Sequence, residues 1–126
     1  MVVSECTLIE APCCNETDSV VAVALEIRKH LLRHIYVLDS EGKPVGVIST
    51  TDMNNRVVAE GKNPGDMVAR DIMTSPIVSI DSGSDEKEAY RVCMKSQIAA
   101  CPVTKEGKVV GIVTVNELVR KLTGVE

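Results

Sequence analysis

EGKPVGVIS, residues 41–49, recurs as EGKVVGIVT, residues 106–114, at an offset of 65 residues. In both copies an acidic residue and a glycine precede a stretch rich in β-branched residues, which indicates a turn followed by a strand. Further upstream, Pro12 and Pro76 precede two other predicted strands, one residue out of step with that offset. The chain therefore contains two similar units, and each predicts one supersecondary motif.

Each unit predicts the element order β-α-β-β-α. The first predicts a strand at 13–14, a helix over 19–33, strands over 34–38 and 44–49, and a helix over 52–60. The second predicts a strand over 77–80, a helix over 85–96, strands over 100–104 and 108–114, and a helix over 116–123 that Gly124 ends. The predicted fold class is α/β, or α+β in the stricter sense, with mixed sheets covered by helices.

The same pattern predicts the domain boundaries. We place the first unit at residues 1–62, a linker at 63–70 and the second unit at 71–126. The linker begins within GKNPG, residues 61–65, which breaks the preceding helix. Neither unit alone buries enough surface to be comfortably stable, so we expect the two units to pack on each other.

The composition predicts a globular protein of the cytoplasm. Hydrophobic residues make up 44% of the chain, charged residues 25%, and the formal net charge is −4. A nucleic-acid binder commonly carries a basic stripe and aromatic side chains for the bases, and this sequence shows neither, so nucleic acid is not the expected partner. No apolar run approaches the ~20 residues that span a bilayer, and the N-terminus lacks the features of a signal peptide, so no membrane association is expected.

Five cysteines are an awkward odd number for a disulfide framework, and we expect them to be thiols. Cys13 and Cys14 are neighbours on a predicted strand, so their side chains point to opposite faces and cannot easily chelate one metal ion together. The matching positions of the second unit are apolar, which favours a role as buried small hydrophobic residues.

Three motifs resemble one known family. DIMTSPIVSI, residues 71–80, is similar to the opening motif of CBS domains. GVISTTD, residues 46–52, and GIVTVNE, residues 111–117, resemble the closing motif of that family, which is glycine, a hydrophobic residue, any residue, Thr or Ser, two further residues and Asp. Because these motifs occur in order over nearly the whole chain, the sequence is identified as a stand-alone tandem CBS-domain pair, or Bateman module.

The resemblance implies two CBS units related by pseudo-two-fold symmetry, usually dimerised, with clefts between the units that bind AMP, ADP, ATP or S-adenosylmethionine. It implies a regulatory or sensory module in which the adenosine compound is a regulatory ligand and no cofactor is required. With no output domain in the sequence, the signal would pass to a separate protein partner. The alternative is a ligand-free scaffold for dimerisation or protein interaction.

Ser49 and Asp52 are the first candidate ligand-binding residues. A carboxylate three residues after a hydroxyl, where a strand meets a helix, suits a ribose phosphate, because the acid can accept hydrogen bonds from both ribose hydroxyls. The alternative is that Thr51 and Asp52 only cap the helix. The match to the family motif favours ligand contact.

The second copy departs from the motif. Thr114 is present, but Glu117 stands where the family has Asp, and its extra methylene would push a ribose outward. Glu117 is also an ordinary partner for a helix dipole, and Asn116 is a candidate cap. The sequence therefore leaves open whether the second cleft is occupied.

Arg33 and His34 precede a predicted strand, at a place where basic residues of the family often face the phosphates of the ligand. They would give the Asp52 cleft a positive wall, or they are a solvated surface pair. The matching residues at the same offset are Ile98 and Ala99, which carry no charge. His34 has no nucleophile or carboxylate partner in its motif and is expected to hydrogen-bond or stack instead of acting as a base.

The resemblance further implies that backbone groups and aliphatic side chains hold the adenine. By matched position the candidates are Val47, Ile77, Ile98 and Ile112, and each is equally well explained as a core residue. No catalytic residue is expected, because the sequence lacks a Walker-type glycine loop, a nucleophile elbow and a metal-ligand cluster. We therefore expect a binding module and not an enzyme.

Overall fold

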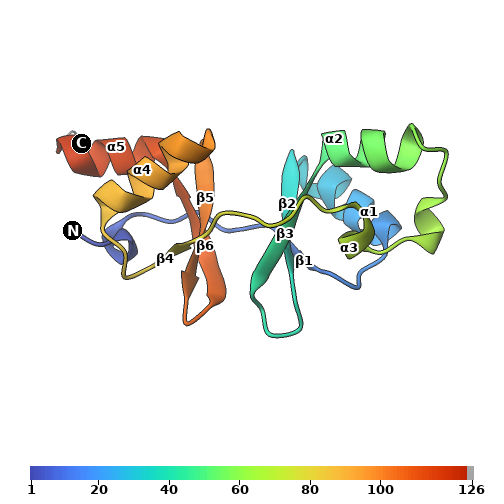
Figure 1. Ribbon diagram of the computed structural model, residues 1–126, viewed down its shortest axis with the longest axis horizontal. Coiled ribbons are helices and arrows are strands. Elements are labelled where there is room, and N and C mark those ends of the chain that lie inside the picture. Colours follow the sequence, from blue (N-terminus) through green and yellow to red (C-terminus); the bar gives the residue numbers. More distant parts are fainter. Residues whose placement is uncertain (125–126) are drawn as a thin grey trace. The chain divides into compact units, whose positions relative to one another are not determined.

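The computed structural model describes residues 1–124 and divides the chain into two compact units (Figure 1). The N-terminal unit comprises Pro12–Ile77, and the C-terminal unit combines Met1–Ala11 with the chain from Val78 onward. The start of the chain joins its second half because the backbone N–H groups of Val3 and Ser4 donate to the carbonyls of Ser84 and Ser82, both at 2.9 Å. The predicted boundaries, 1–62 and 71–126, placed Met1–Ala11 in the first unit, whereas in the structure these residues belong to the C-terminal unit.

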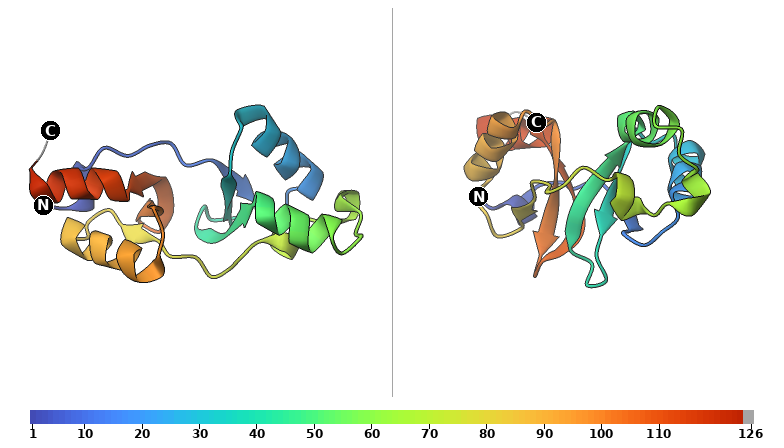
Figure 2. Two further views of the ribbon diagram at one scale, coloured as in Figure 1. Left: turned by 90° about the horizontal axis from the view of Figure 1, so that it is seen from above. Right: turned by 45° about the vertical axis from the view of Figure 1, so that its right-hand side comes forward.

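The N-terminal unit is built on a three-stranded mixed sheet. Strand β2 (His34–Leu38) lies in the middle, parallel to β1 (Cys13–Asn15) and antiparallel to β3 (Pro44–Ser49). Its helices are α1 (Val20–His30), α2 (Thr50–Met53), the π-helical segment η2 (Asn54–Val58), the 3-10 helix η3 (Pro64–Asp66) and α3 (Ala69–Ile72). They lie on one side of the sheet, as both views show (Figures 1 and 2).

The C-terminal unit repeats this plan. Strand β5 (Ala100–Lys105) is parallel to the two-residue β4 (Ile80–Asp81) and antiparallel to β6 (Lys108–Thr114). Helices α4 (Glu86–Ser96) and α5 (Val115–Thr123) lie on one side of this sheet, and the 3-10 helix η1 (Val3–Glu5) comes from the start of the chain (Figure 1). The predicted α/β class with tandem β-α-β-β-α units is therefore confirmed.

The hairpin strands match the prediction closely, and the other elements differ at their ends. The predicted helix over 19–33 ends at His30, because Leu31 adopts the left-handed conformation with φ of 53° and closes the helix. In place of the predicted strand over 77–80, the structure has the two-residue β4, Ile80–Asp81, because these are the residues that pair with β5. The predicted helix over 52–60 begins earlier, at Thr50, and continues as the π-helical η2.

Each unit has its own apolar core between sheet and helices. The core of the N-terminal unit consists of Val20, Val23, Ile35, Val37, Ile48, Val57, Ala69 and Ile72. The core of the C-terminal unit consists of Val3, Cys6, Ile80, Ala89, Cys93, Cys101, Val103, Val113 and Leu118. The core of the N-terminal unit is aliphatic, and that of the C-terminal unit adds three cysteines to aliphatic side chains, so both depend on close packing of small and branched side chains.

The five cysteines, all within the described residues, form no disulfide bond. Burial raises the pKa of Cys101 to about 12 and also raises that of Cys93. The prediction that Cys13 and Cys14 are both buried is wrong for Cys13, which is exposed, whereas Cys14 packs partly against the core. Neighbouring residues of a strand point to opposite faces, and here one of those faces is the core.

Candidate functional site

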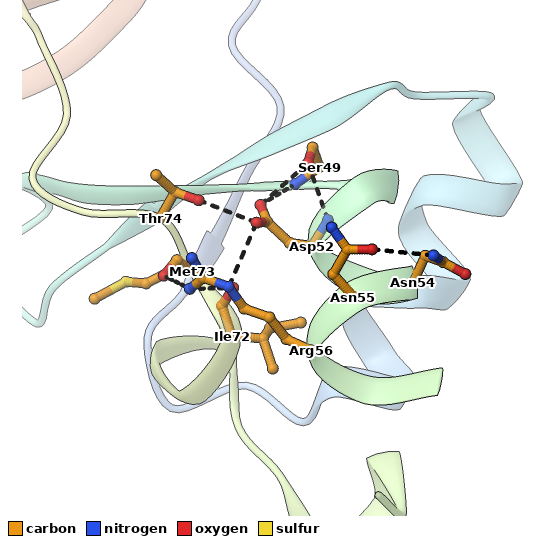
Figure 3. A network of polar contacts seen from close by, with 8 residues as sticks. All are labelled: Ser49, Asp52, Asn54, Asn55, Arg56, Ile72, Met73 and Thr74. Carbon is orange, nitrogen blue, oxygen red and sulfur yellow. Dashed lines mark hydrogen bonds and ion pairs between the residues drawn. The ribbon is translucent and has the colours of Figure 1, made fainter. Parts of the chain in front are cut away.

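The N-terminal unit places a network of polar side chains around Asp52, where β3 runs into α2 (Figure 3). Ser49 caps α2, because its side-chain oxygen accepts the Asp52 N–H at 3.2 Å. In return, Asp52 Oδ2 accepts the Ser49 N–H at 2.9 Å and lies 3.1 Å from Ser49 Oγ. This reciprocal pair is a capping box, and the cap is Ser49, not Thr51 or Asp52 as the sequence suggested.

The other carboxylate oxygen of Asp52 faces the segment that follows α3. Thr74 Oγ1 donates to Asp52 Oδ1 at 3.0 Å. Thr74 also exchanges two backbone hydrogen bonds with Val47 of β3, at 2.8 and 3.0 Å, which fixes its distance from the sheet. The sequence analysis quoted Thr74 within the family's opening motif but gave it no role. The available signal was a hydroxyl residue two positions before Pro76. Its partner Asp52 lies 22 residues away, so the sequence did not indicate the contact.

Arg56 completes the network and was also missed. Its Nη1 donates to the carbonyls of Met73 and Ile72, at 2.7 and 3.3 Å, and its Nε lies 3.7 Å from Asp52 Oδ1. The Asp52 side chain is 12% exposed and that of Arg56 is 46% exposed. The guanidinium therefore links the acid to the backbone next to Thr74, and the carboxylate oxygen Oδ1 lies between the Thr74 hydroxyl and Arg56 (Figure 3).

Arg33 and His34 lie at the same end of the sheet as the Asp52 network. His34 and Ser49 are partners in the antiparallel register of β2 and β3, so their side chains share one face of the sheet. The Arg33 carbonyl accepts the Thr50 N–H at 3.2 Å, which ties the residue to the start of α2. The ring of His34 meets that of Tyr36 edge to face, with centroids 5.4 Å apart.

The aliphatic candidates of this unit fall in different places. Val47 pairs with Tyr36 in the register and lies on the same face as His34, the face opposite the core residues Ile35 and Val37. Ile77 is half-buried and belongs to neither a strand nor a core cluster. Val47 is therefore beside the polar network, whereas no contact described in the structure joins Ile77 to it.

In the C-terminal unit the matching acid has other partners. Thr114 caps α5 by accepting the Glu117 N–H at 3.1 Å, so Asn116 is not the cap. The Glu117 carboxylate does not return to its own cap: Oε2 accepts the Thr7 N–H at 2.6 Å, and Oε1 accepts Nε and Nη2 of Arg120 at 2.8 and 2.7 Å. The Thr7 N–H above all, with Arg120 contributing against partial burial, holds the pKa of Glu117 below its ordinary value of 4.5.

The hairpin registers correct one match made in the sequence. His34 pairs with Ser49, but Ala100 pairs with Thr114, because the first hairpin is one residue longer. Ala99 and Ala100 therefore correspond to Arg33 and His34, in place of Ile98 and Ala99. Ile98 closes the end of α4 through its N–H to the Cys93 carbonyl at 3.0 Å and packs partly against the core.

Ile112 takes the place of Val47 in the C-terminal unit. It is 4% exposed and exchanges two backbone hydrogen bonds with Ile9, at 2.8 and 3.0 Å. Ile9 thus occupies the position that Thr74 has in the other unit, and its side chain carries no hydroxyl. The two units share a backbone plan around their acids but differ in the groups that surround them.

Two segments of the chain, residues 3–59 and 69–124, match the CBS domain family. The chain belongs to the CBS-domain family. As a tandem CBS pair it is 30% identical over 107 residues to the uncharacterized protein MK0525 of Methanopyrus kandleri, which covers 84% of this chain and 55% of that protein. It is also 30% identical over 106 residues to the uncharacterized protein YlbB of Bacillus subtilis, with 83% and 71% covered. The CBS pair thus spans little more than half the length of MK0525.

Solved structures share the fold of this CBS pair. The CBS domain pair of protein MJ0100, solved in complex with 5′-methylthioadenosine and S-adenosyl-L-methionine, matches with a TM-score of 0.71 at 25% identity and covers 100% of this chain and 98% of that one. Hypoxic Response Protein I matches with a TM-score of 0.78 at 21% identity, over 95% and 98% of the two chains.

Between residues 1 and 124, no helix combines the length and the apolar character needed to cross a bilayer. Over the same residues, no three or more His, Cys, Asp or Glu side chains gather where they could hold a metal ion.

Proposed function

We propose that this CBS pair is a sensory module that binds an adenosine-containing ligand at Asp52 and catalyses no reaction. The observation that carries the proposal is the Asp52 network, which presents a fixed carboxylate edge next to a hydroxyl, a guanidinium and the His34 face of the sheet. The ligand-bound CBS pair of protein MJ0100, at 25% identity, supports the choice of ligand class.

The geometry suits a ribose. Asp52 Oδ2 is engaged by the two groups of Ser49, whereas Oδ1 accepts one hydrogen bond, from Thr74. A carboxylate oxygen has two lone pairs, so Oδ1 can accept a ribose hydroxyl without breaking the capping box. The capping box then acts as a support that keeps the carboxylate in place before the ligand arrives.

The basic groups near this acid favour a ligand that carries phosphate. Arg33 and His34 stand at the end of β2 next to Ser49, and Arg56 is half-exposed beside Asp52. A guanidinium recognises phosphate by a planar pair of donors. We therefore expect the phosphate number of the preferred nucleotide to depend on Arg33 and Arg56.

The test is thermal unfolding of the purified protein with AMP, ADP, ATP and S-adenosylmethionine, followed with an extrinsic dye because the chain has no Trp. A ligand at ~100 times its dissociation constant adds about 2.7 kcal/mol to the stability of the folded state. That corresponds to a rise in Tm of several degrees for a chain of this size.

Asp52→Asn is the matched variant, because the amide oxygen can still accept the Ser49 N–H while the charge is removed. Loss of at least tenfold in affinity is expected, and Asp66→Asn, an exposed acid on η3, is the control that keeps wild-type affinity. Equal affinity of Asp52→Asn and wild type would contradict the site. No shift with any of the four compounds, in nucleotide-free protein, would favour the scaffold function instead.

A homodimer is part of the same proposal. Val21 and Leu25 lie one turn apart on the same side of α1 and are 41% and 47% exposed. Exposed large apolar side chains that cluster on a surface mark interaction sites. Light scattering after size exclusion should give twice the 13.6 kDa of one chain, and the mass of a single chain would contradict the dimer.

A further inference from the structure

The two acids at matching positions of the CBS pair accept the same number of hydrogen bonds but from different donors. Asp52 and Glu117 stand 65 residues apart, each three residues after the hydroxyl residue that caps its helix. Both side chains are largely covered, at 12% and 10% exposure. Since the surrounding backbone is alike, the difference between the sites comes from which groups already bind each carboxylate.

Glu117 is engaged on both oxygens by donors outside its own cap. Oε1 accepts two N–H groups of Arg120 in a side-on pair, and Oε2 accepts the Thr7 N–H at 2.6 Å. Hydrogen bonds from a guanidinium or a backbone N–H to a carboxylate are about twice as strong as neutral ones. Oε2 keeps a second lone pair, as Asp52 Oδ1 does. The charge of Glu117, however, is already paired with Arg120 at 2.7 Å, whereas Arg56 stays 3.7 Å from Asp52, so Glu117 is the weaker acceptor for a ribose hydroxyl.

Thr7 belongs to the N-terminal arm, which we define as Val3–Ile9. The arm is held on the C-terminal unit by three sets of bonds: the η1 backbone to Ser82 and Ser84, Thr7 to Glu117, and Ile9 to Ile112. The middle contact joins residues 110 positions apart and uses the extra methylene of Glu. In the N-terminal unit the shorter Asp52 turns back to Ser49 instead.

We propose that Glu117 is a tether for the N-terminal arm and, with its charge paired by Arg120, is the weaker acceptor for ribose, so that each chain takes one adenosine ligand, at Asp52. Ile9 stands where the other unit has Thr74, and its lack of a hydroxyl also disfavours ligand binding at the C-terminal unit. The stoichiometry rests on the proposed function, whereas the tether does not.

The tether is tested by amide hydrogen exchange of the full chain, followed residue by residue by NMR. Glu117→Ala should speed exchange of the Thr7 N–H at least tenfold while the core amides of Val113 and Leu118 stay protected. Glu117→Gln, which keeps the size and one acceptor oxygen, should give an intermediate rate and serves as the variant that preserves packing. Unchanged exchange of Thr7 in both variants would overturn the tether.

The stoichiometry is tested by equilibrium dialysis with S-adenosylmethionine, AMP and ATP as probes. We expect one site per chain in wild type, none in Asp52→Asn, and one site of affinity within threefold of wild type in Glu117→Gln. Two sites in wild type, one of which Glu117→Gln removes, would overturn the inference. If none of the probes binds wild type, the proposed function fails, and the exchange of Thr7 decides the tether by itself.

Discussion

Substitution of Gly111 by Ala should destabilise the protein more than the same change at Gly46. Both glycines stand at the same position of the two hairpins, and neither has a positive φ, so the cost of an added methyl group depends on what surrounds it. A Cβ at Gly111 would lie 2.9 Å from Leu8 Cβ and 3.1 Å from the Ile9 carbonyl oxygen. A Cβ at Gly46 would lie 2.5 Å from Met73 Sδ, 2.9 Å from its Cγ and 3.0 Å from its Cβ.

The magnitudes follow from how freely these neighbours move. Overpacking costs typically ~1–3 kcal/mol, and Ala in place of Gly returns ~0.5–1 kcal/mol of backbone entropy. Rotation of the flexible Met73 side chain moves its Sδ and Cγ away and leaves its Cβ at 3.0 Å, a contact that a shift of a few tenths of an ångström relieves, so we expect about 1 kcal/mol for Gly46→Ala. At Gly111 the backbone of the arm must shift, which also weakens the 2.8 Å bond from Ile112 N–H to the Ile9 carbonyl, so about 2–3 kcal/mol is expected.

Urea unfolding followed by circular dichroism measures both variants. With a slope of ~1–3 kcal/mol per molar urea, the difference between them corresponds to roughly 1 M in the midpoint. Gly61→Ala, at a position with open space but a positive φ of 65°, separates backbone strain from crowding. A Gly111→Ala protein as stable as Gly46→Ala would refute the argument that the arm's backbone, and not a side chain, closes this position.

Three further predictions concern the polar groups and the thiols. Thr74→Val keeps the shape of the side chain but removes the donor to Asp52 Oδ1. Because this hydrogen bond is exposed, the change should lower the free energy of unfolding by ~0.5–1.5 kcal/mol in urea titrations, whereas Thr17→Val, on an exposed turn, should change it little. Because the folded protein holds the pKa of Glu117 below 4.5, this residue contributes stability above that pH and loses it as the pH falls through the lower value. The stability advantage of wild type over Glu117→Gln should therefore shrink on acidification, and an advantage that grows would contradict the contact with Thr7. Burial raises the pKa of Cys101 to about 12, so at about pH 8 iodoacetamide should label this residue only after unfolding, which mass spectrometry detects.

The sequence predicted the hairpins and the family most reliably. Strands over 34–38, 44–49 and 108–114 were placed within their observed bounds, because β-branched stretches next to a glycine turn are set by local interactions. Ser49 and Asp52 were brought together correctly, since they are three residues apart. The helix over 19–33 was drawn too long, because the left-handed Leu31 that ends it is not a residue type that signals a stop.

The candidate site was only partly predictable. Of its polar groups, Thr74 and Arg56 were missed, and the match of Ile98 to the basic pair was shifted by one residue. The missed contact of Thr74 crosses 22 residues, and the shift arises from the different lengths of two turns. Neither is visible as a period in the sequence, because both depend on how separate elements are placed against one another.

The sequence by itself determined two CBS units with the same order of elements, since repeated hydrophobic patterns and turn residues act over a few neighbouring positions. Only the tertiary structure decided what the two acids bind. Asp52 folds back on its own cap, while Glu117 reaches Thr7 of the N-terminal arm, 110 residues earlier in the chain. One extra methylene permits that reach, but it becomes a contact only because packing brings the first residues of the chain onto the second half.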